Sequence, residues 1–419
     1  IVYFATHPRK HAAVVSSDPA TTLHTSAPLN DESMEQQALA LQEKGSYPEA
    51  EKLFRACLAE RQRTLGPSHI DTLAAMNNLA NLLHVRGQNA EALSLNEQCL
   101  AAREKTLGPD HPHTLASRNN LAMVLRDKGD FAAAEALYRE AWESMKRVVG
   151  PDHPDTLSML NNLANVLSDM GEYEKAEPAY RELNQRLEAT LGREHLSTIA
   201  GQGNLANLLL RKGDYISAGP IYIRCFEIRA RLQGADHPET VLAMSNLAAY
   251  RMKTGSYSEA EALYRRCLAS RKKSLGADHA ETIATTKNLA EALREKHALT
   301  EAEQYARAAV TAFERILGAE HPDTADSWTT LAEVLRDKGD FVTAASLFDR
   351  AVDGLRVSLG STHPTTLLAL YEYSVMRKSQ GQLAEARRLA NELVASARAS
   401  LPKNHPDRSK YERHADSLR

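Results

Sequence analysis

The chain has 419 residues, of which 43% are hydrophobic and 25% are charged, and its net charge is −3. This composition can form a continuous buried core, and it lacks the basic excess that nucleic-acid-binding proteins carry. No apolar run approaches the ~20 residues that a membrane-spanning helix needs, and no secretory hydrophobic segment is visible at the start. We therefore predict a protein without a nucleic-acid partner and without membrane insertion.

Residues 1–29 differ in composition from the rest of the chain. They contain three prolines, many small residues and one acidic residue, Asp18. We predict an extended N-terminal tail. Because the chain begins at Ile1, we expect a fragment or a processed product, and a trimmed linker is favoured over the end of an organelle transit peptide. The predicted location is the cytoplasm, with a plastid or mitochondrion as the alternative.

From residue 30 onward, one loop motif returns at a constant spacing of 42 residues. It reads Leu-Gly-x-x-His-Pro-x-Thr and is complete at residues 107–114. Its glycine recurs from Gly66 to Gly360, without insertion or deletion. A fixed period of this length predicts a stack of identical units, each too small to bury its own core. The array is predicted to span residues 30–401, followed by a capping helix over residues 402–419.

Each unit is predicted to be a hairpin of two helices. Apolar residues recur at steps of three and four in two successive stretches, as they do on helices with one buried face. The turn between the two helices carries a glycine, for example Gly129, which ends a helix in the left-handed conformation. Nine such hairpins fit the array, so the predicted fold is an all-α, right-handed α-solenoid.

Residues suited to helix N-termini mark both helices of a unit. The proline that follows most of the loop histidines suits the first position of the first helix. N-caps of the second helix are predicted at Asp130, Asp214 and Asp340, and capping boxes at Ser46 with Glu49 and Ser256 with Glu259. Every unit is therefore expected to have fixed ends.

One unit departs from the pattern. At its hairpin turn His297 and Leu299 replace the glycine and the aromatic residue that are usual in the other units. We predict that this turn is the weakest point of the array. Pro178 and Pro220 lie inside second helices, where a proline removes a backbone hydrogen bond and can bend the helix.

The four cysteines share one phase of the repeat, which other units fill with alanine or leucine. They are Cys57, Cys99, Cys225 and Cys267. Equivalent positions in neighbouring units should lie ~10 Å or more apart, beyond the ~7 Å limit for a disulfide. We predict buried, reduced thiols, as is usual for an intracellular protein.

The two-helix pattern resembles the tetratricopeptide repeat, with Ala80, Phe131, Ala134 and Tyr138 at matching positions. The 42-residue period, the loop motif and the sequence Asn-Asn-Leu-Ala at residues 119–122 resemble the kinesin light chain type of this repeat. The resemblance implies that the first helices line a concave groove, which holds an extended peptide. It implies a non-enzymatic adaptor or scaffold for protein–protein interaction. The alternatives are a structural or assembly subunit of a larger complex, and a regulatory repeat array cut from a longer protein.

Polar residues at the groove phase of the first helices form the candidate peptide-binding site. One set is an asparagine ladder, comprising Asn78, Asn120, Asn162, Asn204, Asn246 and Asn288. The other set is cationic, comprising Arg126, Arg211, Lys253, Arg294 and Arg336. The amides can pair with the backbone of an extended ligand, or they can bond to the neighbouring unit and set the stacking. The arginines can hold an acidic side chain, or they can form a solvated, self-paired surface.

No catalytic or metal site is predicted. The phased histidines, from His69 to His405, lie on loops about a unit's thickness apart, too far to share a metal ion. We interpret them as loop-packing residues at the starts of helices. No zinc-ligand spacing, phosphate loop or nucleophile elbow is present, so neither an enzyme nor a cofactor is predicted. The sequence leaves the partner and the oligomeric state open.

Overall fold

The computed structural model describes residues 29–401, 403 and 405–419. The predicted tail lies outside these residues, apart from Leu29, which begins the first helix. The described part contains 19 α-helices and no strand, so the all-α prediction is confirmed.

The helices form nine hairpins followed by one further helix. The first helices of the hairpins are α1 (Leu29–Glu43), α3 (Ile70–Val85), α5 (Pro112–Asp127), α7 (Pro154–Asp169), α9 (Leu196–Lys212), α11 (Pro238–Lys253), α13 (Ala280–Glu295), α15 (Pro322–Lys338) and α17 (Pro364–Ser379). The second helices are α2 (Tyr47–Thr64), α4 (Asn89–Leu107), α6 (Phe131–Val148), α8 (Tyr173–Leu191), α10 (Tyr215–Gln233), α12 (Tyr257–Ser274), α14 (Leu299–Leu317), α16 (Phe341–Ser358) and α18 (Leu383–Ser400). The last helix is α19 (Pro406–Asp416). The two prolines predicted inside second helices lie in α8 and α10.

The loop that begins each unit from the second onward, here called the opening loop, has one geometry throughout. Its histidine is the N-cap of the following helix, and the ring Nδ1 accepts a hydrogen bond from the backbone N–H two residues on, as His111 does from His113 at 3.2 Å. In most units the threonine hydroxyl donates to the carbonyl of the loop glycine, for example from Thr72 to Gly66 at 2.8 Å. The histidines are therefore helix-start residues, as predicted.

The predicted caps of the second helices are confirmed in part. Asp130, Asp214 and Asp340 each accept a hydrogen bond from the N–H three residues on. The capping boxes are wrong, because Ser46 and Ser256 occupy the N-cap position without a side-chain cap bond. The backbone at these serines matches that at Asp130, so the shorter hydroxyl does not reach the N–H that the aspartate reaches.

The core runs between the helices of each unit and into the next unit. The large fully buried residues include Tyr138, Tyr222 and Tyr264, which occupy one phase of the second helices. The prediction for the cysteines is confirmed, since all four are free and buried. The Cys99 thiol lies 3.4 Å from the carbonyl oxygen of Leu73, and burial raises the pKa of the Cys225 thiol to about 11.

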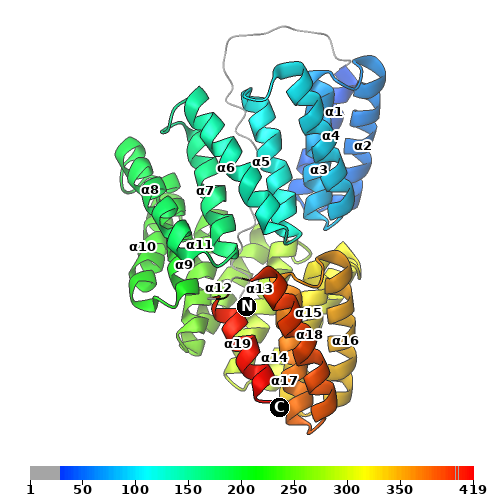
Figure 1. The fold of residues 1–419 in the computed structure, drawn as a ribbon, viewed down its shortest axis with the longest axis vertical. Coiled ribbons are helices and arrows are strands. Elements are labelled where there is room, and N and C mark those ends of the chain that lie inside the picture. The colour runs from blue at the N-terminus through cyan, green and yellow to red at the C-terminus, as the bar shows by residue number, and fades with distance from the viewer. Residues whose placement is uncertain (1–28, 402, 404) are drawn as a thin grey trace.

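The array curves through more than one turn of a superhelix. Successive first helices contact one another, as α13 does with α15 and α15 with α17, which places them on the inner side of the curve. Figure 1 shows the units of α1–α6 above the units of α13–α19. The first helices therefore line the concave groove, and the two ends of the array lie over each other.

The irregular turn has a strained backbone. His297 is the one non-glycine residue with positive φ in the described part, at 61°, where most other hairpin turns have glycine at 73–88°. A left-handed conformation costs a non-glycine residue roughly 1–2 kcal/mol. We expect His297→Gly to raise the free energy of unfolding by about 1 kcal/mol in a urea titration.

The matched control for this prediction is Gly255→Ala, at a turn with φ of 76° and no neighbouring atom in the way. It should lower stability by a similar amount. A loss of stability in His297→Gly would contradict the interpretation of this turn as strained.

Candidate functional site

The asparagine ladder lies on the first helices, and its first four members are bonded to the neighbouring unit. Each of these four amide nitrogens donates to a side chain of the preceding first helix. The bonds run from Asn120 to Asn77 at 2.6 Å, from Asn162 to Asn119 at 2.8 Å and from Asn204 to Asn161 at 2.7 Å, and Asn78 donates to Glu35 at 2.6 Å. These bonds link consecutive units, so the ladder contributes to stacking whatever else it binds.

The last two members of the ladder differ from the others. Neither Asn246 nor Asn288 hydrogen-bonds to another residue within the described part of the chain. Thr330 and Glu372 follow them at this phase. The neutral ladder therefore ends after α9, and the later units of the groove are charged.

Two of the predicted cationic residues share one carboxylate. Arg126 of α5 and Arg211 of α9 both lie 2.5 Å from Asp169 of α7. The side chains of Arg126 and Asp169 are largely buried, and that of Arg211 is half-buried. The two guanidinium groups lower the pKa of Asp169 against the effect of burial. The sequence interpretation did not single out Asp169, although its helix lies between those of the two arginines.

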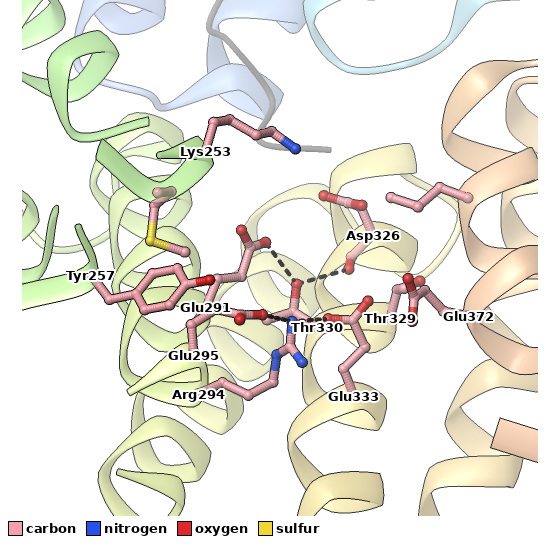
Figure 2. Close-up of a pocket in the computed structure, with 12 residues that line it drawn as sticks. Lys253, Tyr257, Glu291, Arg294, Glu295, Asp326, Thr329, Thr330, Glu333 and Glu372 are labelled. Carbon is pink, nitrogen blue, oxygen red and sulfur yellow. Dashed lines mark hydrogen bonds and ion pairs between the residues drawn. The ribbon is translucent and has the colours of Figure 1, made fainter. Parts of the chain in front are cut away.

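The other predicted cations lie at or beside a cavity in the later part of the groove. This cavity has a volume of about 250 Å³ and is lined mainly by first helices of four consecutive units, α11, α13, α15 and α17. Lys253 and Arg294 line it, and Arg336 hydrogen-bonds at 2.9 Å to Glu372, which also lines it. Figure 2 shows the amino group of Lys253 at the mouth of the cavity, above the carboxylates.

Carboxylates outnumber cations around this cavity. Five of them line it, namely Glu291, Glu295, Asp326, Glu333 and Glu372, against Lys253 and Arg294. Arg294 lies 2.6 Å from Glu295 and 3.3 Å from Glu333. Asp326 is in addition paired with the buried Lys287. The predicted arginines are thus neutralised by neighbours, and a surplus of negative charge is left.

The charge surplus shows in the titration of Glu333. Burial, and then the negative charge of Glu372, raise the pKa of its carboxyl to about 7. The predicted site contained cationic residues from this part of the groove but not Asp326, which lies two helical turns before Glu333 on the same face of α15. The helical periodicity that placed Arg336 on the groove face could also have identified Asp326.

No group of three or more histidine, cysteine or acidic side chains in the described residues has a geometry that would hold a metal ion. Among the same residues, no helix combines the length and the apolar character needed to cross a membrane.

The family model described as Tetratricopeptide repeat matches the chain in seven segments, most of which overlap. These are residues 31–105, 73–147, 116–189, 196–273, 242–315, 281–356 and 323–399. The chain belongs to the tetratricopeptide repeat family. Together with the helical hairpins, this membership supports a role in protein–protein interaction. None of the curated proteins compared with the chain matches it.

Several solved structures resemble this tetratricopeptide array. A putative kinesin light chain from Podosopora anserina with nearly identical TPR-like repeats is 28% identical, with a TM-score of 0.45 over 50% of this chain and 99% of that one. BtubC (BKLC) from P. vanneervenii is 21% identical, with a TM-score of 0.42 over 57% of this chain and 93% of that one. A Rap protein complexed with Competence and Sporulation Factor is 12% identical, with a TM-score of 0.49 over 83% and 98%.

The ladder bonds allow a direct test of their structural role. We expect the double substitution Asn120→Ala with Asn162→Ala to lower the free energy of unfolding by about 1–3 kcal/mol, since two neutral hydrogen bonds at ~0.5–1.5 kcal/mol each are lost. The measurement is urea unfolding followed by circular dichroism. The control is Asn246→Ala with Asn288→Ala, which removes the same groups where no ladder bond exists. Equal losses in the two double variants would show that the ladder bonds do not hold the units together.

Proposed function

We propose that this tetratricopeptide protein is a non-enzymatic adaptor that holds an extended segment of a partner protein in its concave groove. The observation that carries the proposal is the cavity along α11, α13, α15 and α17, which opens on the face that the first helices line. A site built from four consecutive units fits an elongated ligand better than a compact one. The family supports a protein as the partner.

The asparagine ladder supports backbone recognition in the first four units. Each ladder bond uses one N–H of the donating amide, whereas a primary amide offers two donors and an acceptor with two lone pairs. Asn120, Asn162 and Asn204 are half-buried, so part of each amide still faces the groove. A ligand backbone can therefore bond to the same residues that hold the units together. Recognition of this kind tolerates many ligand sequences.

We assign the recognition of a charged ligand side chain to the cavity and not to Arg126 and Arg211. Arg126 and Arg211 already share Asp169, so an acidic ligand group there would have to displace a buried carboxylate. The cavity, by contrast, has more carboxylates than cations, and burial together with the negative charge of Glu372 raises the pKa of Glu333. We therefore propose that the bound segment carries a lysine or arginine at this point.

Lys253 offers a test of this proposal, because it lies on the groove side of α11, is exposed and has no hydrogen bond to another described residue. Peptides selected from a random dodecapeptide display library serve as the probe. We expect the selected peptides to be rich in lysine or arginine, and Lys253→Glu to tighten their binding about three- to tenfold at low salt, because a competing cation becomes an anion.

The matched control is Lys272→Glu, an exposed lysine on α12 of the same unit but outside the groove lining. It should leave the affinity unchanged, which calorimetry or fluorescence anisotropy can measure. Selection of acidic peptides that lose affinity with Lys253→Glu would contradict the charge assignment. Equal effects of the two substitutions would contradict the groove as the binding site.

A further inference from the structure

The two turns of the superhelix meet through a contact that repeats four times. A glycine at the bend between the two helices of a unit in the first superhelical turn lies against the opening-loop histidine six units further along the chain. The pairs are Gly45 with His279, Gly87 with His321, Gly129 with His363 and Gly171 with His405. The corresponding glycines of the later units, Gly213, Gly255, Gly339 and Gly381, have nothing within 4 Å of an added Cβ. We call the four pairs the clasp.

The second pair shows how such a contact is built. The Nδ1 atom of His321 accepts a hydrogen bond from the N–H of Asp323 at 3.0 Å, so in the neutral ring the proton is on Nε2. That Nε2 lies 3.3 Å from the carbonyl oxygen of Val85, to which it donates. One ring thus caps a helix in the second turn and bonds to the end of a helix in the first. In the fourth pair, the ring of His405 lies 6.2 Å from that of Tyr173.

Burial separates the clasp histidines from the others of the same motif. The side chains of His321 and His405 are 6% exposed, whereas those of His69 and His153 are 31% and 36% exposed. His195 is exposed. Because each of these histidines caps its helix in the same way, the difference comes from the first superhelical turn, which covers the second.

The clasp is also narrow. Within the described residues, helices of the first superhelical turn do not pack along helices of the second. The two superhelical turns approach each other through the bends between helices and through the opening loops. Leu317 of α14 also packs at the edge of the core of the first units. Figure 1 shows this boundary between α3–α5 above and α13–α19 below. So small an interface can open while each turn stays folded, because a solenoid is held by nearest-neighbour contacts.

We propose that the clasp is a proton-operated closure, which holds the two turns of the superhelix together when its histidines are neutral and releases them together when the imidazoles take up protons. The closure is a property of the chain without any partner, so it goes beyond the adaptor function.

The surroundings of the clasp histidines fit this role. Burial lowers the pKa of His363 to about 4, although Asp127 of α5, Asp169 of α7 and Asp326 of α15 favour its charged form, while Arg126 of α5 opposes it. Burial also lowers the pKa of His405, which faces Tyr173 of α8, Arg211 of α9 and Asp407 of its own helix.

The sign of the pH dependence follows from these shifts. The pKa of His363 is lower in the closed state than in an open state, where the pKa of the ring returns to its ordinary value near 6.5. The stabilising effect on closure is therefore fully present above about pH 6.5 and is lost as the pH falls from there toward 4. For His363 alone, the opening equilibrium should rise roughly thirtyfold between pH 7.5 and pH 5.

Opening would affect the groove, because charged residues of the candidate site act on the clasp histidines. Asp326 lines the cavity and also acts on His363, as do Asp169 and Arg126, and Arg211 acts on His405. Protonation at the clasp therefore adds positive charge beside the groove at the same time as the turns separate.

A spin-label experiment tests the closure on the whole chain. Labels are placed at Ala90→Cys and Glu320→Cys, two exposed positions on either side of the clasp, while the native cysteines are buried. Pulsed electron spin resonance then gives the populations of short and long distances. We expect the short distance at pH 7.5 and a growing long-distance population toward pH 5, with circular dichroism unchanged.

Histidine substitutions supply the matched controls. The fourfold variant His279→Asn, His321→Asn, His363→Asn and His405→Asn keeps the N-cap acceptors but removes every clasp ring that can be protonated, so the distance should no longer depend on pH. The fourfold variant His69→Asn, His111→Asn, His153→Asn and His195→Asn makes the same change outside the clasp and should behave as the unsubstituted chain. Opening that persists in the first variant, or a short distance that survives at pH 5 in the unsubstituted chain, would overturn the proposal.

A pair of glycine substitutions tests the closure without pH. An added Cβ at Gly87 would lie 2.9 Å from the His321 ring, whereas an added Cβ at Gly255 would have no neighbouring atom within 4 Å. The φ angles of the two glycines are nearly the same, 73° and 76°. Backbone strain is therefore matched between Gly87→Ala and Gly255→Ala. We expect the long distance at pH 7.5 in the first variant only. Identical distance distributions in both would overturn the clasp.

Discussion

The structure depends on the hydrogen bonds of the opening loop. In each loop the histidine ring caps the next helix, and in most of them the threonine hydroxyl bonds to the glycine carbonyl. These bonds fix the angle at which one unit follows another, and the constant 42-residue spacing repeats that angle without error. A repeated angle produces a regular superhelix. Only a regular superhelix brings four helix-to-helix bends of the first superhelical turn onto four opening loops of the second. The groove and the clasp are both consequences of this one local geometry.

The groove divides into two parts that are held together differently. In the first part, neutral amides bond from one unit to the next, and Asp169 joins two arginines across three units. In the second part, acidic and basic side chains alternate around a cavity, and acidic groups prevail. In the adaptor proposal, the neutral amides bind the backbone of the partner segment and the surplus carboxylates bind its cation. A segment that lies along both parts would be gripped by its backbone in one and selected by its charge in the other.

The fold could be predicted from the sequence because every local signal agrees with the same period. Glycine at the hairpin turn, proline after the histidine and the helical stripe all recur in phase, so each unit confirms the others. The capping boxes at Ser46 and Ser256 failed because the motif specifies residue types and not the reach of a side chain at the φ and ψ found there. The shared partner of Arg126 and Arg211 also follows from periodicity, because Asp169 precedes Arg211 by one repeat of 42 residues, but only the cationic residues of the groove were predicted.

The clasp could not be predicted from the sequence. His195 and His363 stand in the same motif, yet one is exposed and the other buried, because their difference depends on what lies six units away. That distance is set by the sum of small rotations between units, which no local pattern records. The same reason explains why the sequence could place polar residues on the groove face but not say which of them already have partners.

Hydrogen exchange at the hairpin-turn glycines tests the central claim, that the two turns are in contact in solution. The amides of Gly87, Gly129, Gly255 and Gly339 all donate to the carbonyl three residues back, so their local protection is matched. The account predicts slower exchange at Gly87 and Gly129, which the second turn covers, than at Gly255 and Gly339. Fraying of an open solenoid from its ends predicts a different order, because Gly87 is nearer to an end of the array than Gly255. Equal exchange at all four, or faster exchange at Gly87 than at Gly255, would contradict the account.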